Sequence, residues 1–205
     1  MMTHSTPKLP DGPLLTYYGD DFTGSTDVME AFTSSGIATV LFLQPPSKED
    51  LERFKEMRCF GLAGQSRGQS PDWMEKVLPS IFENLASIGA PILQYKVCST
   101  FDSSATVGSI GYAIDIGTKI TGGHWSPMIV GAPRLKRYQV FGQLFAAVNG
   151  VSYRIDRHPT MSRHPITPMD EADLRVHLRK QTKKTIALVD IADIAEGIGQ
   201  KKLES

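Results

Sequence analysis

Short apolar runs alternate along this chain with stretches in which apolar residues recur at helical spacing. The apolar runs predict strands over residues 14–18, 38–43, 59–63, 91–98, 128–131 and 185–189. Glycine or proline bounds several of these runs, as is typical of strand ends. Strands that alternate with helices favour a mostly parallel sheet with helices on both faces, which is a Rossmann-like α/β fold.

The segments between the strands predict helices. Val28, Met29 and Phe32 share one face of a helix that follows Gly24, and Gly36 suits its C-terminal end. Further helices are predicted over residues 48–54, 70–87, 107–120 and 167–182. The helical stripe formed by Met29, Phe32, Trp73, Val77, Ile81 and Leu85 is expected in the core.

The pattern changes after residue 138. Residues 139–155 predict a short β-hairpin extension, or two short strands, interrupted at Gly142 and at Asn149–Gly150. Residues 154–168 contain three prolines and predict a loop. Its first part, residues 154–164, is the one dense basic patch, which is either solvated or helps to hold an anion.

The charge balance and the hydropathy of the chain limit the kinds of partner that it is expected to bind. The 205 residues include 22 Lys and Arg and 22 Asp and Glu, so the formal net charge is +0. Nucleic-acid-binding proteins usually carry a basic excess, so this balance argues against nucleic acid. The apolar runs fall short of the roughly 18 residues that a membrane-spanning helix needs, and the polar N-terminus lacks a signal-peptide core. We therefore expect a cytoplasmic protein with no membrane partner.

Motifs of several enzyme classes are absent. The sequence has no GxxxxGKS/T phosphate loop, no GxGxxG after a strand and no GxSxG nucleophile elbow. Its two cysteines lack the spacing of a zinc site and are too few for a disulfide framework. His158 and His164 have no further ligand at suitable spacing, so no metal site is expected.

Polar residues collect directly after the predicted strands. In chain order they are Asp20, Asp21, Arg67, Lys96, Ser99, Thr100, Arg134, Lys136 and Arg137. In a parallel sheet, ligands bind beyond the carboxyl ends of the strands. We therefore expect these side chains at one edge of the sheet. Paired carboxylates, a lysine and arginines together suit a small, hydroxylated, anionic substrate.

Each of these groups also has a purely structural interpretation. Asp20 and Asp21 could cap the following helix, and Arg67 could be a solvated loop charge. Lys96 is harder to dismiss, because a lysine at the end of an apolar strand is rarely buried without a partner. The hydroxyl residues that follow it serve equally in turns or in an anion-binding loop.

Five blocks occur in a characteristic order. They are Gly19–Asp27 (GDDFTGSTD), Ser66–Arg67, Tyr95–Ser103 (YKVCSTFDS), Lys136–Arg137 with Gly142 and Leu144–Phe145, and His164–Met169 (HPITPM). Together these blocks resemble the N-terminal domain of the four-carbon acid sugar kinase family. Many members have KxxDSTLRG in the third block, where this chain has Cys98 and Asp102 in place of the Asp and the Arg. This version is similar to the 3-oxo-tetronate and 3-oxo-isoapionate kinase branch.

The resemblance implies one half of a two-domain kinase. Residues 14–196 would form the sugar-acid-binding domain, between a flexible tail at 1–13 and a polar end at 197–205. The family's C-terminal domain, which would bind ATP with Mg²⁺, is absent from this chain. The chain alone is therefore expected to be inactive. Its expected partners are a sugar acid and its own C-terminal domain, with a homodimer as a further option.

The same resemblance, with the chemistry of phosphoryl transfer, implies roles for individual residues. Arg67 is the first choice to pair with the substrate carboxylate, and Arg137 is the second. Asp20 or Asp21 would bind the substrate hydroxyls and deprotonate the attacking one, and Lys96 would stabilise negative charge. Further substrate contacts are expected from Ser99, Thr100 and His164. The alternative is a non-catalytic binding or effector module that uses the same basic cleft for an anionic ligand or a protein.

Overall fold

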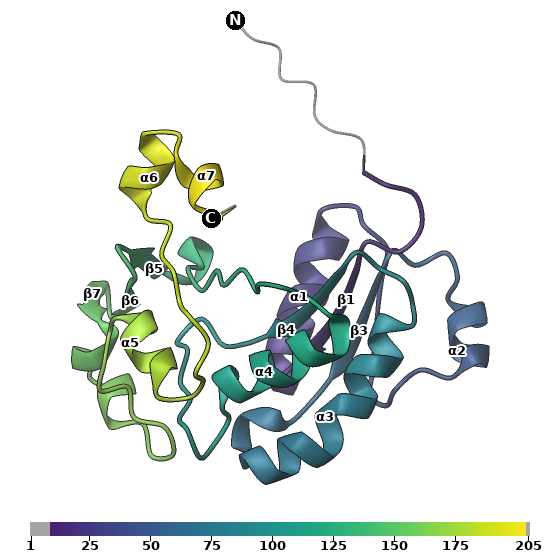
Figure 1. Ribbon diagram of the computed structural model, residues 1–205, viewed down its shortest axis with the longest axis horizontal. Coiled ribbons are helices and arrows are strands. Elements are labelled where there is room, and N and C mark those ends of the chain that lie inside the picture. The colour runs from purple at the N-terminus through teal and green to yellow at the C-terminus, as the bar shows by residue number, and fades with distance from the viewer. Residues whose placement is uncertain (1–8, 204–205) are drawn as a thin grey trace, which may run out of the picture. The chain divides into compact units, whose positions relative to one another are not determined.

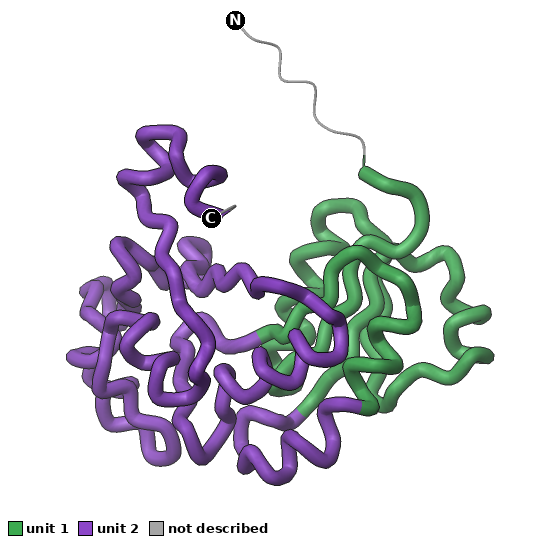
Figure 2. Tube along the Cα trace, viewed as in Figure 1, with its two compact units in different colours: residues 1–64, 80–96 green, residues 65–79, 97–205 purple. Residues whose placement is uncertain are grey.

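The computed structural model describes residues 9–203, which form two compact units. Unit 1 comprises the residues up to 64 together with residues 80–96 (Figure 2). Unit 2 comprises residues 65–79 together with the chain from residue 97 onward. The division falls inside one helix, α3 (Pro71–Ala86).

Unit 1 contains the predicted parallel sheet. Its elements are β1 (Leu15–Gly19), α1 (Phe22–Ser34), β2 (Thr39–Phe42), α2 (Lys48–Arg53), β3 (Cys59–Ala63), the second half of α3, and β4 (Ile92–Lys96) (Figure 1). The strand order is β2-β3-β1-β4, and every pair is parallel. The α/β class expected from the alternating pattern is therefore confirmed.

Two neighbouring tyrosines of β1 show which helix covers which face of this sheet. The hydroxyl of Tyr17 donates to the carbonyl of Ser25 in α1 at 3.1 Å. The next residue, Tyr18, packs edge-on against Phe82 of α3 and stacks on Tyr95 of β4. Successive side chains of a strand point to opposite faces. Helices α1 and α3 therefore cover opposite faces, as the sequence predicted.

Unit 2 is built around an antiparallel sheet and contains further helices. Its elements include α4 (Ile110–Thr121), β5 (Arg137–Val140), β6 (Gln143–Val148), β7 (Val151–Arg154), α5 (Leu174–Arg179), α6 (Ile191–Ala195) and α7 (Gly199–Leu203). Both hairpin loops have two residues with positive φ, Phe141–Gly142 and Asn149–Gly150, as type I′ turns require. The predicted hairpin extension is thus a meander of three strands, in the order β5-β6-β7.

The core of unit 2 joins this sheet to loops and helices. Its most deeply buried apolar residues are Phe101, Leu144, Ala146, Ile155, Met169, Ala172 and Leu174. These residues come from β6, α5 and the irregular segments on either side of the sheet. The core of this unit therefore depends on loops as much as on regular elements.

The two strands predicted at 128–131 and 185–189 are wrong, because neither segment is a strand. Met128, Val130 and Ile186 instead pack into the core of unit 2 from irregular segments. A short apolar run signals burial and does not by itself distinguish a strand from a buried loop. Consequently Arg134, Lys136 and Arg137 do not follow a strand of the parallel sheet; they lie at and before the start of β5.

The helix predicted at 167–182 is shorter than expected, because α5 covers only Leu174–Arg179. The preceding segment is extended beside β6, where the amide of Leu144 donates to the carbonyl of Ala172 at 2.9 Å. Asp173 then caps α5 by accepting from the amide of Arg175. Pairing with a neighbouring strand thus overrides the local helical pattern.

The expected tail at 1–13 lies partly outside the described residues, which begin at 9. Within them, the guanidinium of Arg58 donates to the carbonyls of Pro10 and Gly12. The expected polar end at 197–205 contains α7, and its last two residues lie outside the described range. Over residues 9–203, no helix is both long enough and apolar enough to cross a membrane.

Candidate functional site

The carboxyl edge of the unit 1 sheet brings together three of the predicted site residues, Asp20, Asp21 and Lys96. Gly19, the last residue of β1, pairs in register with Ala63 of β3 and with Lys96 of β4. The ladder continues one step further, since the amide of Asp20 donates to the carbonyl of Lys96 at 3.0 Å. The backbone therefore places both carboxylates directly beyond the end of Lys96's strand.

The turn from β1 into α1 requires glycine at position 19. A Cβ on Gly19 would lie 1.9 Å from the hydroxyl oxygen of Ser25 and 3.1 Å from the carbonyl oxygen of Asp21. The hydroxyl of Ser25 in turn donates to that carbonyl at 2.6 Å. The first turn of α1 therefore lies against the end of β1, which fixes the backbone that carries the two aspartates.

The two aspartates differ in their surroundings. Asp21 is the N-cap of α1, and its Oδ1 accepts from the amide of Gly24 at 2.7 Å, so the structural interpretation applies to this residue. Asp20 is only 4% exposed although it lies beyond the end of the strand. A carboxylate is costly to bury unless polar groups surround it. Asp20 is therefore the less ordinary member of the pair.

The pleat of the sheet determines the face toward which the side chain of Lys96 points. Tyr95 stacks on Tyr18 with ring centroids 5.8 Å apart, and both rings lie on the α3 face. Lys96, the next residue, therefore points to the α1 face, level with the bare backbone of Gly19. The backbone thus places Lys96 next to Asp20 at the end of the sheet, with the Lys96 side chain on the face that α1 covers.

In unit 2, a second polar cluster forms between the loop after β4 and the segment at 164–167. Thr100 donates to Asp102 at 2.5 Å, and the hydroxyl of Thr167 lies 3.5 Å from the other oxygen of that carboxylate. The amide of Thr167 donates to Nδ1 of His164 at 3.1 Å. Thr100, Asp102 and Thr167 are all buried. The structure thus brings the predicted Thr100 and His164 together, with Ser99 half-buried at the start of the cluster.

Asp102 and Thr167 were not predicted as site residues. Both lie inside sequence blocks that carried the resemblance, Tyr95–Ser103 and His164–Met169, so the sequence held a signal for them. The link between the blocks is a contact across 65 residues. Nothing in a single sequence reports such a contact.

Arg67 also lies in unit 2, in a short 3₁₀ turn at Ser66–Gly68. Gly108, with φ of 59°, approaches this turn closely, and a Cβ there would lie 2.3 Å from the carbonyl oxygen of Arg67. The amide of Gly108 donates to the carbonyl of Gln69 at 2.8 Å. The backbone at Arg67 is therefore held by Gly108, which lies just before the N-terminus of α4.

Arg137 has a structural role that the sequence did not suggest. Its guanidinium donates to the carbonyl of Leu135 at 2.8 Å and to that of Lys136 at 3.4 Å. Its Nε is buried and has no hydrogen-bond partner among residues 9–203. These bonds stabilise the tight turn before β5, where Lys136 has a φ of 55°.

The basic loop at 154–164 is folded by its own contacts. Arg154 and Asp156 form a bidentate ion pair at 3.1 and 2.7 Å. His158 is buried, and its Nδ1 accepts from the amides of Thr160 and Met161. Burial, with the positive charge of Arg137, lowers the pKa of His158. Within the described part of the chain, no three His, Cys, Asp or Glu side chains form a group that could hold a metal ion.

Residues 15–205 match the family described as a sugar-binding N-terminal domain. The chain belongs to this family. The sugar-binding domain is 65% identical over 185 residues to a 3-oxo-isoapionate kinase from Paraburkholderia graminis, covering 90% of the chain and 39% of that protein. It is 30% identical over 203 residues to a 3-oxo-tetronate kinase from Pseudomonas fluorescens, covering 96% of the chain and 43% of that protein.

The sugar-binding domain thus spans about two fifths of the length of these relatives. Its fold is shared with a Haemophilus influenzae protein, at a TM-score of 0.76 and 24% identity, over 91% of this chain and 43% of that one. It is also shared with a Bordetella bronchiseptica protein solved as a domain-swapped dimer with bound citrate. That match has a TM-score of 0.66 and 21% identity, over 92% of this chain and 45% of that one.

The sugar-binding domain also has a cavity of about 620 Å³ at the end of α5, which the sequence did not predict as a site. Its lining residues are Asp115, Arg179, Lys180, Gln181, Thr182, Lys183 and Lys184. Lys180 is paired with Asp170 at 2.9 Å, and Asp115 accepts from Thr182 at 2.8 Å. The remaining cations make this cavity a second place where an anion could be attracted, so it provides a control for binding experiments.

Proposed function

We propose that this chain binds the sugar-acid substrate of an ATP-dependent kinase, and that the substrate is a 3-oxo-tetronate or the similar 3-oxo-isoapionate. The observation that carries the proposal is the 65% identity over 185 residues to a protein named 3-oxo-isoapionate kinase. The site supports it, because a lysine and two carboxylates at one sheet edge suit a polyhydroxylated anion.

In this proposal the aspartates act on the substrate hydroxyls. Ionised carboxylates only accept hydrogen bonds, so Asp20 and Asp21 would orient the hydroxyls of the sugar acid. One of them takes the proton of the attacking hydroxyl while the hydroxyl oxygen bonds to the γ-phosphorus of ATP and the bond from that phosphorus to the departing ADP breaks. Asp20 is the better candidate for this role, because Asp21 already caps α1 through Oδ1.

The cations and hydroxyls would hold the anionic parts of the substrate. Lys96 would stabilise negative charge on the substrate or on the transferring group. Arg67 would clamp the carboxylate with two parallel N–H bonds, which a lysine cannot reproduce. Further contacts are assigned to Ser99, Thr100 and His164. Arg137 is the weaker choice for the carboxylate, since its guanidinium already serves the turn before β5.

The nucleotide would be held elsewhere. The sequence contains no glycine-rich phosphate loop, and residues 9–203 offer no acidic cluster suited to Mg²⁺. The proposal therefore assigns ATP and Mg²⁺ to a C-terminal nucleotide-binding domain of the kinase, and it assigns the reaction to the cytoplasm. A homodimer is consistent with the domain-swapped dimer described for the Bordetella protein.

A domain graft tests the kinase assignment. The matching N-terminal part of the Paraburkholderia kinase is replaced by this chain, and ADP release is followed with 3-oxo-isoapionate and with 3-oxo-tetronate. We expect ATP-dependent turnover of at least one acid. A graft that also carries Lys183→Ala and Lys184→Ala, at the cavity beyond α5, should keep that turnover.

Two results would contradict the assignment. A folded graft that binds the acid without turnover would favour the alternative, a non-catalytic module for anionic ligands. Loss of binding in the Lys183→Ala/Lys184→Ala graft would move the site to the cavity beyond α5. The unmodified Paraburkholderia kinase serves as the positive control, and circular dichroism confirms that each graft is folded.

A further inference from the structure

The loop that carries Thr100 and Asp102 is built around an unfavourable backbone conformation. Phe101, between them, has a φ of 58°, although its side chain is large and fully buried. Residues with a Cβ rarely adopt this left-handed conformation, and it persists only where several contacts enforce it. The contacts that enforce it here therefore also determine where Thr100 and Asp102 point.

The side chain of Ser103 holds the backbone of Phe101 in this conformation. Its hydroxyl donates to the carbonyl of Phe101 at 3.0 Å, while the amide of Phe101 donates to the carbonyl of Cys98 at 3.0 Å. Because a serine hydroxyl has one proton, its other bonds must be accepted by the oxygen. Those bonds involve His177 in α5 and Gln181, the residue after the C-cap of α5.

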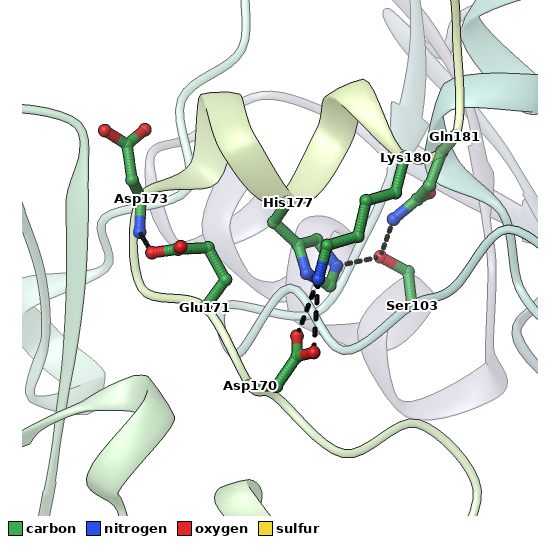
Figure 3. Close-up of polar contacts among 7 residues, drawn as sticks. All are labelled: Ser103, Asp170, Glu171, Asp173, His177, Lys180 and Gln181. Atoms are coloured by element: carbon green, nitrogen blue, oxygen red, sulfur yellow. Dashed lines mark hydrogen bonds and ion pairs between the residues drawn. The ribbon is translucent and has the colours of Figure 1, made fainter.

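Two further side chains lie at hydrogen-bond distance from the hydroxyl oxygen of Ser103 (Figure 3). Gln181 donates through Nε2 at 2.8 Å, and Nε2 of His177 lies 3.0 Å away. With the serine proton committed to Phe101, His177 must carry its own proton on Nε2. Its Nδ1 has no hydrogen-bond partner among the described residues. Burial lowers the pKa of His177, so the network and the burial together favour the neutral tautomer with its proton on Nε2.

The same two residues fix the network in place. The ring of His177 packs against the ring of Phe101 with centroids 5.9 Å apart. The other end of the Gln181 amide accepts from the amide of Gly111 in α4 at 3.2 Å. Phe101 is therefore held by its amide, its carbonyl and its ring; His177 packs against the ring directly and reaches the carbonyl through Ser103.

We infer that His177 is a positioning residue, which acts through Ser103 and Phe101 to hold Thr100 and Asp102 in the arrangement that binds the sugar acid. This inference rests on the proposed function for its ligand. Its structural part, the control of the Phe101 turn by His177, stands independently of that function.

Three variants separate this role from general stability. His177→Phe keeps a buried ring against Phe101 and removes the Nε2 proton. His177→Gln returns an amide donor that can reach the position of Nε2. Leu178→Ala removes a buried side chain of the same core from the next position of α5, and removes none of the hydrogen-bonding side chains of the network.

The first measurement is made without ligand, by NMR. The three-bond coupling between the amide proton and the Hα of Phe101 reports φ, and the shifts of Thr100 and Asp102 report their surroundings. We expect the coupling and both sets of shifts to change in His177→Phe. They should return toward the wild-type values in His177→Gln and should keep those values in Leu178→Ala. The second measurement is titration calorimetry with 3-oxo-tetronate, where we expect about tenfold weaker binding in His177→Phe, and binding within about threefold of wild type in the other two.

Each outcome is decisive. Unchanged Phe101 signals in His177→Phe, or equal changes in Leu178→Ala, would overturn the inference. So would altered signals with unaltered affinity in His177→Phe. If wild type binds no acid while the Phe101 signals respond as expected, the proposed function fails and the control of the turn by His177 stands.

Discussion

The two units hold their candidate site residues by different means. In unit 1, Asp20 and Lys96 are placed by the backbone ladder of a parallel sheet, and no other side chain is needed to bring them to one edge. In unit 2, Thr100 and Asp102 lie on a strained loop that is held by side-chain hydrogen bonds from distant residues. Substitution of aspartate by asparagine at the sheet edge should therefore alter catalysis and leave the backbone unchanged. Substitutions around the loop should instead alter the conformation of the loop itself.

The largest effect is expected at the sheet edge. Asp20→Asn should lower kcat of the grafted kinase at least 100-fold, because a general base contributes on the order of 10²–10⁴, and Asp21→Asn should lower it less. Asparagine caps helices about as well as aspartate, so the melting temperature should not change. If Asp21→Asn keeps full turnover while Asp21→Ala only destabilises the fold by about 1 kcal/mol, Asp21 is a helix cap and nothing more.

Arg67 tests whether unit 2 contributes a charged contact. A hydrogen bond to a charged group contributes about 1.5–3 kcal/mol, so Arg67→Lys should weaken binding of 3-oxo-tetronate roughly 10- to 100-fold. Erythrulose, the neutral ketose with CH₂OH in place of the carboxylate, should bind wild type and variant equally in calorimetry. Equal weakening of both ligands would show that Arg67 is no carboxylate clamp.

A smaller effect on stability is expected at the turn between β1 and α1. Gly19→Ala should lower the free energy of unfolding by about 1–3 kcal/mol, as overpacking does, because the new methyl group would overlap the Ser25 hydroxyl. Adding Ser25→Ala should recover part of the loss in urea unfolding. Wild-type stability of Gly19→Ala would mean that α1 does not lie against β1 as described.

The smallest effect is a pH dependence that belongs to unit 2. Burial lowers the pKa of His177, with Lys180 acting in the same direction and Asp170 and Glu171 against it. The folded state therefore keeps His177 neutral at a pH where the unfolded chain already binds a proton. Stability should be fully present above about pH 6.5 and should fall as the pH decreases below it.

Urea unfolding between pH 7 and 5 measures this loss. It should be smaller in His177→Phe, and His158, whose pKa is also lowered, should account for part of the remainder. Identical slopes in wild type and His177→Phe would contradict the assignment of a neutral, buried His177.

The same contrast decides how much of the molecule the sequence predicts. Strands β1 to β4 follow from alternating apolar runs, and the edge with Asp20 and Lys96 follows from the rule on carboxyl ends. In unit 2 the apolar runs at 128–131 and 185–189 are buried without forming strands, because core contacts and not a ladder bury them. The bond of Asp102 to Thr167 and that of Ser103 to His177 join residues far apart in the chain, so no local pattern reveals them.

Titration of the wild-type chain with freshly prepared 3-oxo-tetronate and with erythrulose tests the central claim most directly. The two ligands differ only in the carboxylate, so calorimetry isolates recognition of the acid. We predict saturable binding of one acid per chain and at least tenfold weaker binding of erythrulose. Equal affinity for the two ligands, or no heat from the acid at millimolar concentration, would contradict the assignment of this domain to a sugar-acid substrate.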